Sequence, residues 1–300
     1  MSNFSRNISG FGILKNQLLS NEFLQRLNVD LIQTGEAFFA FRNEEATVYY
    51  KGNQLCNLAA SNGYAPTIYN HYLPITRSQT ISGSRKKEPY SVEQWKRAIG
   101  SSDLSFGDVV SEIKDNLEKE KSPESLQASR FYRFSPLNHC EKHEIVLLDI
   151  EAAFSYTGEK TDRIDLVFYH TADRRLMFVE VKRLSDSRLY AKGTAPAEVI
   201  DQLKRYKKRL AGETQQINSQ YNNVIDYYNA LSGGNLPHIP QESDPLLGLL
   251  LVEFTQSGKD TANKKAVQNI MKQESLKMYS IGNTSSLTDA TLTAIYKSIK

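Results

Sequence analysis

Two neighbouring apolar segments, each interrupted by charged residues, constrain the fold of this chain more than any other feature. Residues 164–170 run Ile-Asp-Leu-Val-Phe-Tyr-His, and residues 176–182 run Leu-Met-Phe-Val-Glu-Val-Lys. Each segment is rich in β-branched and aromatic residues and has the length of one strand. Residues 171–174 between them are enough for a hairpin turn, so we expect the two segments to pair as antiparallel strands.

The alternation of side chains along a strand places the charged residues of these segments. Glu180 and Lys182 are two residues apart and share a face, and a hairpin can bring Asp165 near Glu180. Charges within such apolar strands need a partner or a metal to offset their desolvation. Two carboxylates suit a hard divalent cation, and Lys182 beside it can position or deprotonate a water and offset phosphate charge. Hydrolysis of a phosphodiester needs this combination.

A simpler explanation exists for each of these residues taken alone. Glu180 and Lys182 can form an ordinary exposed ion pair across strands, and Asp165 can be a solvent contact at a strand edge. The hypothesis of a site therefore depends on all three residues occurring together in two strongly apolar strands.

Further elements around the hairpin predict a mixed α/β domain. An amphipathic helix is expected at 105–120 and a first strand at 145–156. After the hairpin, Pro196 opens a helix to about residue 210, with an apolar stripe every three or four residues. A polar helix at 218–231 and a buried strand at 246–254 follow, and then a helix, a strand at 277–281 and a last helix.

These residues resemble a known family of nucleases. Ile-Asp-Leu-Val, a hairpin and Phe-Val-Glu-Val-Lys-Arg look like the signature of the PD-(D/E)XK superfamily, with Asp165 as its Asp and Glu180-Val181-Lys182 as its (D/E)XK. On the following helix, Gln202 and Tyr206 are similar to the Gln-x-x-x-Tyr motif of the RecB-like branch. The resemblance covers roughly residues 145–254.

The resemblance implies a restriction-endonuclease-like mixed sheet flanked by helices, and a nuclease that depends on Mg²⁺ or Mn²⁺. Asp165, Glu180 and the Val181 carbonyl would hold the metal, and Gln202 would help to hold the site. Tyr206 would contact the substrate or support Gln202, although its place on the apolar stripe also fits a core residue. DNA is the implied substrate, with RNA left open, and the implied setting is phage defence, restriction or DNA repair.

The chain departs from the family pattern upstream of Asp165. Arg163 and Ile164 stand there, without the proline of the motif, and the acidic residue that often completes the metal site is not identified. The candidates for this acid are Glu112, Glu144 and Glu151, of which Glu112 and Glu151 fit better.

A basic segment follows the hairpin. Between Lys182 and Arg209 nine lysines or arginines face only three acids. Such a helix face is usually just solvated, but beside a nuclease site it is a candidate track for a phosphate backbone. We therefore predict substrate contacts from Lys204, Arg205 and Lys208.

The first hundred residues are expected to form a separate α+β module, and residues 101–300 the nuclease-like domain. A helix at 13–27 precedes strands at 36–42, 46–50 and 54–59, separated by tight turns as in a meander. An exposed loop is expected at 77–88, and Ser91 can cap a short helix carrying Trp95. The module can bind DNA, a partner protein, a signal or a second copy, and its sequence does not decide between them.

Composition narrows the remaining possibilities. The net charge of +3 does not itself imply nucleic-acid binding, and no apolar run is long enough to span a membrane. Two cysteines and no secretory signal indicate a cytoplasmic protein. His139-Cys140-x-x-His143 lacks the second pair of ligands that a zinc site needs. The alternatives to a nuclease are a catalytically inactive nucleic-acid-binding module on the same fold and a structural or interaction subunit.

Overall fold

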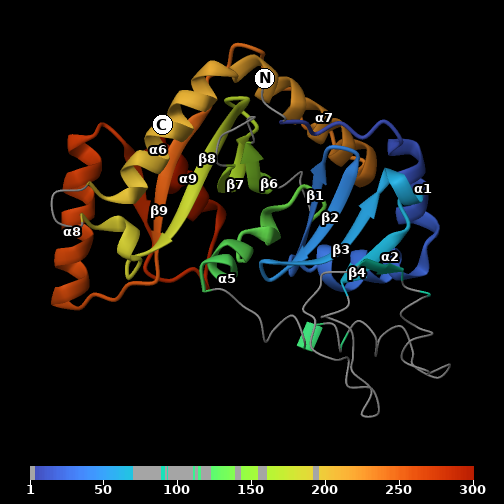
Figure 1. Ribbon diagram of the computed structural model, residues 1–300, viewed down its shortest axis with the longest axis horizontal. Coiled ribbons are helices and arrows are strands. Elements are labelled where there is room, and N and C mark those ends of the chain that lie inside the picture. Colours follow the sequence, from blue (N-terminus) through green and yellow to red (C-terminus); the bar gives the residue numbers. More distant parts are fainter. Residues whose placement is uncertain are drawn as a thin grey trace. The chain divides into compact units, whose positions relative to one another are not determined.

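The computed structural model divides the chain into two compact units (Figure 1). The amino-terminal unit is Arg6–Arg133, and the carboxy-terminal unit joins Met1–Ser5 to Phe134–Lys300. The sequence placed a domain boundary near residue 100; the amino-terminal unit also includes helix α5 (Pro123–Ser129), whose Ser125 lies against Gly52 in the turn after residue 50. The residues described are 4–69, 89–91, 93, 111, 114–115, 123–138, 143–154, 161–191 and 196–300.

The amino-terminal unit is built on an antiparallel sheet in the order β1-β2-β3-β4-β5. Its described elements before α5 are α1 (Phe11–Ser20), α2 (Glu22–Leu27), the π-helix η1 (Asn28–Ile32), β1 (Ala37–Arg42), β2 (Glu45–Tyr50), β3 (Asn53–Ala59), the 3-10 helix η2 (Ala60–Asn62), β4 (Pro66–Tyr69) and β5 (Pro89–Ser91). The three-stranded meander is confirmed. The sequence did not anticipate β4 and β5, which extend the sheet.

The predicted helix at 13–27 is two helices. Asn21 separates them with an extended backbone, and its side chain accepts a hydrogen bond from the Leu24 amide, as an N-cap does. The predicted loop at 77–88 and Trp95 lie outside the described residues, as does most of the predicted helix at 105–120. Ser91 itself belongs to β5.

The carboxy-terminal unit contains a five-stranded mixed sheet in the order β10-β9-β8-β7-β6. Its elements are the 3-10 helix η4 (Tyr132–Phe134, beginning in the other unit), β6 (Ile145–Phe154), β7 (Asp162–His170), β8 (Arg175–Arg183), the 3-10 helix η6 (Ser187–Leu189), α6 (Glu198–Gly212), α7 (Thr214–Ser232), β9 (Leu246–Val252), α8 (Gly258–Gln273), β10 (Lys277–Ser280) and α9 (Asp289–Ile299). Strands β6, β7 and β8 are antiparallel, and β8, β9 and β10 are parallel. The mixed α/β architecture is thus confirmed.

Helices cover both faces of this sheet (Figure 1). On one face, Tyr221 of α7 packs against Phe178 of β8, and Tyr206 of α6 is buried. On the other face, Ile299 of α9 lies so close to Gly248 of β9 that a Cβ there would be 2.5 Å from its side chain. Among the described helices none is long and apolar enough to cross a membrane.

Helix α6 begins two residues later than predicted. Pro196 precedes it, and Ala197 is its N-cap with an extended backbone, so the first helical residue is Glu198. Its buried residues include Val199, Leu203, Tyr206 and Leu210, the stripe predicted from the sequence. This stripe fixes which side chains of α6 face the sheet.

Candidate active site

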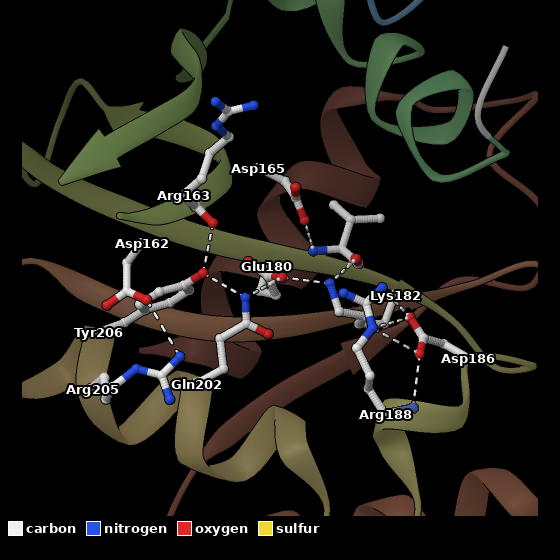
Figure 2. Close-up of polar contacts among 11 residues, drawn as sticks. Asp162, Arg163, Asp165, Glu180, Lys182, Asp186, Arg188, Gln202, Arg205 and Tyr206 are labelled. Carbon is white, nitrogen blue, oxygen red and sulfur yellow. Dashed lines mark hydrogen bonds and ion pairs between the residues drawn. The ribbon is translucent and has the colours of Figure 1, made fainter. Parts of the chain in front are cut away.

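The hairpin of β7 and β8 opens where the charged residues begin. The two strands pair from His170 and Arg175 at the turn as far as Leu166 and Val179. Asp165 is the next residue of β7, and its carboxylate accepts a hydrogen bond of 2.7 Å from the Val181 amide (Figure 2). Beyond the last paired residues, the Asp165 side chain thus takes the place of a backbone partner and holds its carboxylate beside the residue that follows Glu180.

Glu180 and Lys182 form a buried ion pair on one face of β8. Each is 2% exposed. The Lys182 Nζ donates hydrogen bonds to Glu180 Oε1 and, at 3.2 Å, to the Val181 carbonyl. The simpler explanation, an exposed pair across strands, is therefore wrong. Burying two charges is costly and is weak evidence for a stabilising role, so this pair calls for another explanation.

Helix α6 adds two polar side chains to the same network. Gln202 Nε2 donates to Glu180 Oε1 at 2.9 Å and also to the Tyr206 hydroxyl. The Tyr206 hydroxyl in turn donates to the Arg163 carbonyl at 2.6 Å. Tyr206 is 1% exposed, so its ring is part of the core. Its hydroxyl also supports Gln202 through their hydrogen bond. Figure 2 shows this chain of contacts running from β7 through α6 to β8.

Burial dominates the electrostatics of the two carboxyls. It raises the pKa of Glu180 to about 8, with the negative charge of Asp165 adding to the effect and Lys182 opposing it. Burial also raises the pKa of Asp165, against the nearby charge of Lys182. Burial and the Glu180 charge raise the pKa of Tyr206, so its hydroxyl stays protonated and able to donate. A cation bound between the two carboxyls would favour their charged forms.

The donor set at this position fits a hard divalent cation. Among the described residues, Glu180 Oε2 is buried and has no hydrogen-bond partner. Asp165, Glu180 and the Val181 carbonyl would supply oxygen ligands, and Mg²⁺ commonly completes its shell with waters. No cluster of three or more acidic, histidine or cysteine side chains suited to a metal occurs in the part of the chain that the structure describes.

The acid predicted to complete the metal site stays a prediction, since no group of three metal-binding side chains occurs among the described residues. Glu151 on β6 lies between Ile150 and Ala152, which pair with the two neighbours of Asp165, and it accepts a hydrogen bond from Arg163 at 3.3 Å. Glu144 lies 3.4 Å from His170 near the opposite end of β7. Glu112 lies outside the described residues. Of the zinc candidates, His139 and Cys140 also lie outside them, and His143 contacts Asp289 at 2.6 Å.

A polar cavity of about 380 Å³ adjoins the network. Its lining residues are Thr161, Asp162, Arg163, Arg188, Glu198, Asp201, Gln202, Arg205 and Tyr206. Of the four residues predicted to contact the substrate, Arg205 and Tyr206 border it, whereas Lys204 and Lys208 do not. Lys204 forms an ion pair with Glu274 at 2.6 Å, and Lys208 is exposed. Both fall outside the cavity because they lie on other faces of α6 than Gln202.

Sequence reasoning missed two residues of this cavity. Arg188 was counted only as one charge of the basic segment, yet its charge acts on Asp165 and its side chain lines the cavity. Asp162 is 4% exposed and pairs with Arg205 at 3.3 Å and with Arg209 at 3.1 Å. Nothing in the sequence around Asp162 indicated that its side chain would be buried.

Comparison with known proteins adds no independent assignment. No protein-family model matches the chain, and no curated protein is significantly similar to it in sequence. The interpretation of the site therefore depends on the order of the motifs and on the geometry that brings Asp165, Glu180, Lys182, Gln202 and Tyr206 together.

Loss of the Tyr206 hydroxyl separates its two roles. Tyr206→Phe keeps the ring in the core but removes the hydroxyl's hydrogen bonds with Gln202 and with the Arg163 carbonyl, so we expect the free energy of unfolding to fall by about 1–3 kcal/mol. If the hydroxyl also holds Gln202 for catalysis, cleavage should fall about 10–100-fold, as for outer partners of metal ligands. Urea unfolding and initial cleavage rates measure the two effects.

The matched control is Tyr221→Phe. Tyr221 is equally buried, and its hydroxyl donates to Asp149 at 3.0 Å, away from Glu180. This variant should lose stability but keep its cleavage rate. Equal cleavage rates for the two variants would assign Tyr206 to the core alone.

Proposed function

We propose that the carboxy-terminal unit is a metal-dependent nuclease of the PD-(D/E)XK type that hydrolyses phosphodiester bonds of DNA. One observation carries the proposal: Lys182 and Gln202 both donate to the buried carboxylate of Glu180, one residue from the Val181 amide that binds Asp165. The mixed sheet with helices on both faces supports a restriction-endonuclease-like fold, which is part of the proposal.

Each residue has a distinct role in this proposal. Asp165, Glu180 and the Val181 carbonyl would hold Mg²⁺ or Mn²⁺, which when bound would supply Lewis-acid activation of the phosphate and of a water. The Lys182 amine orients the attacking water and offsets the charge that develops on the phosphate. Gln202 holds the Glu180 carboxylate, and Tyr206 holds Gln202. The water adds to phosphorus as the bond to the leaving oxygen breaks.

The same proposal includes a cytoplasmic role in phage defence, restriction or DNA repair. The amino-terminal unit would recognise DNA, a partner protein or a second copy of the chain. The test of the core function is a cleavage panel of supercoiled plasmid, linear duplex, single-stranded DNA and RNA, each with Mg²⁺, with Mn²⁺ and with a chelator. We expect divalent-dependent cleavage of DNA. Nucleic-acid binding without any cleavage would favour the inactive binding module instead.

Metal affinity should depend on pH because a proton competes for the same carboxyl. Burial raises the pKa of Glu180 to about 8, so near neutral pH a proton competes with the cation for this carboxyl. Below that value each bound cation displaces a proton, and the Kd for Mn²⁺ should fall by up to about tenfold per pH unit as pH rises. Above it the Kd should level off.

Calorimetric titration with Mn²⁺ at several pH values checks this dependence. Repeating one titration in buffers of different ionisation enthalpy counts the protons released, and we expect about one per metal ion at neutral pH. A Kd that does not change between pH 6 and 8, with no proton release, would mean that Glu180 is not a ligand.

A further inference from the structure

We propose that Arg188 and Arg205 bind the two phosphates on either side of the scissile phosphate, so that one nucleic-acid strand crosses the site between them. The inference rests on the proposed nuclease function and names the residues that hold its substrate. Both arginines line the cavity of about 380 Å³ beside Gln202. In Figure 2 they lie on opposite sides of Gln202 and Glu180.

Arg205 is oriented by a buried acid but keeps most of its hydrogen-bonding capacity. Among the described residues, its guanidinium makes a single polar contact, of 3.3 Å, with Asp162. The side chain of Arg205 is 50% exposed, whereas that of Asp162 is 4% exposed and is also held by Arg209. A guanidinium has five N–H donors, so a fixed and half-exposed one can still bind a phosphate through two of them.

Arg188 is also oriented by an acid on the other side, and more tightly than Arg205. It lies in η6, shortly after β8, where Asp186 accepts hydrogen bonds from its amide at 2.8 Å, from its Nε at 3.0 Å and from its Nη2 at 2.5 Å, so a phosphate would bind the outer N–H groups. The side chain of Arg188 is 41% exposed. It lines the same cavity as Gln202, which donates to Glu180, so Arg188 lies near the site rather than on a remote surface.

The charge of the cavity favours a phosphate that is part of a strand over a free anion. Glu198 and Asp201 line it together with the arginines, so the cavity has no large net positive charge. Binding must then come from the directed N–H groups of each guanidinium and from several phosphates held at once. A strand with its scissile phosphate at Asp165 and Glu180 satisfies both conditions.

The test uses oligonucleotides in which a single phosphate is replaced by an uncharged methylphosphonate, on one side or the other of the cleavage position. Affinity is measured with Mn²⁺ in a Lys182→Ala background, so that the substrate stays intact. Each replacement should weaken binding about tenfold. Arg205→Ala should abolish the penalty for one replacement, and Arg188→Ala the penalty for the other. Each variant should also flatten the dependence of log affinity on log salt by about 0.7 for a single strand or 0.9 for a duplex.

Lys207→Ala is the matched control, since Lys207 is an exposed cation of the same helix that does not line the cavity. It should leave both penalties unchanged, and Arg205→Lys should restore part of the lost one. Circular dichroism checks that every variant is folded. If the arginine variants still lose affinity at both methylphosphonate positions, the inference is overturned. Cleavage by the wild type would in that case still support the proposed nuclease function. A wild-type protein that neither binds nor cleaves nucleic acid would overturn both.

Discussion

Lys182→Ala is expected to lower the rate constant for phosphodiester cleavage about 10²–10⁴-fold, the range typical of a group that acts on a proton or a charge in the transition state. Nucleic-acid affinity should change little, because an interaction made mainly in the transition state affects turnover more than binding. Single-turnover cleavage and fluorescence anisotropy measure the two quantities on the same substrate.

Arg183→Ala is the control for this variant. Arg183 is the next residue of β8, points to the other face and pairs with Glu253 rather than with Glu180. The Arg183→Ala variant should cleave DNA at the wild-type rate. Should Lys182→Ala instead weaken binding as much as it slows cleavage, Lys182 would contribute ground-state charge and not catalysis.

Asp165→Asn is expected to remove metal binding and, with it, cleavage. The amide oxygen can still accept from the Val181 amide, so the hairpin should stay folded, and one negative charge beside Glu180 is gone. A cation at about 100 times its Kd stabilises a folded protein by about 2.7 kcal/mol. Wild-type protein should show this stabilisation with Mg²⁺ or Mn²⁺, and Asp165→Asn should lose most of it.

Thermal unfolding with and without each cation provides the measurement. Metal-free Asp165→Asn should bind nucleic acid at least as tightly as the metal-free wild type, because a carboxylate facing the phosphate has been neutralised. A variant that gains as much stability from Mn²⁺ as the wild type does would remove Asp165 from the list of ligands.

The elements that position the site were predictable because their patterns are local. Alternation and the four-residue turn located β7 and β8, and the apolar stripe located α6. The same patterns placed Glu180 and Lys182 on one face. The ends of elements were less accurate: the break at Asn21 and the late start of α6 depend on the backbone of single capping residues.

The contacts that join elements were not predictable from one chain segment. The bond between Asp165 and the Val181 amide exists only because the strands separate there. Lys204 forms an ion pair with Glu274, which lies seventy residues further along the chain. The sequence of the basic helix alone therefore could not show which of its cations line the cavity. The burial of Lys182, which rules out the exposed ion pair, likewise depends on packing in the folded unit.

The central claim is tested most directly by cleavage of supercoiled plasmid by wild-type protein with Mg²⁺, with excess chelator, and after the metal is restored. Lys182→Ala and Asp165→Asn, purified in the same way, show whether the activity belongs to this chain. We predict that the wild type cleaves only when the metal is present and that neither variant cleaves measurably. Intact plasmid in every wild-type reaction with Mg²⁺ or Mn²⁺, or equal cleavage by wild type and both variants, would contradict the account.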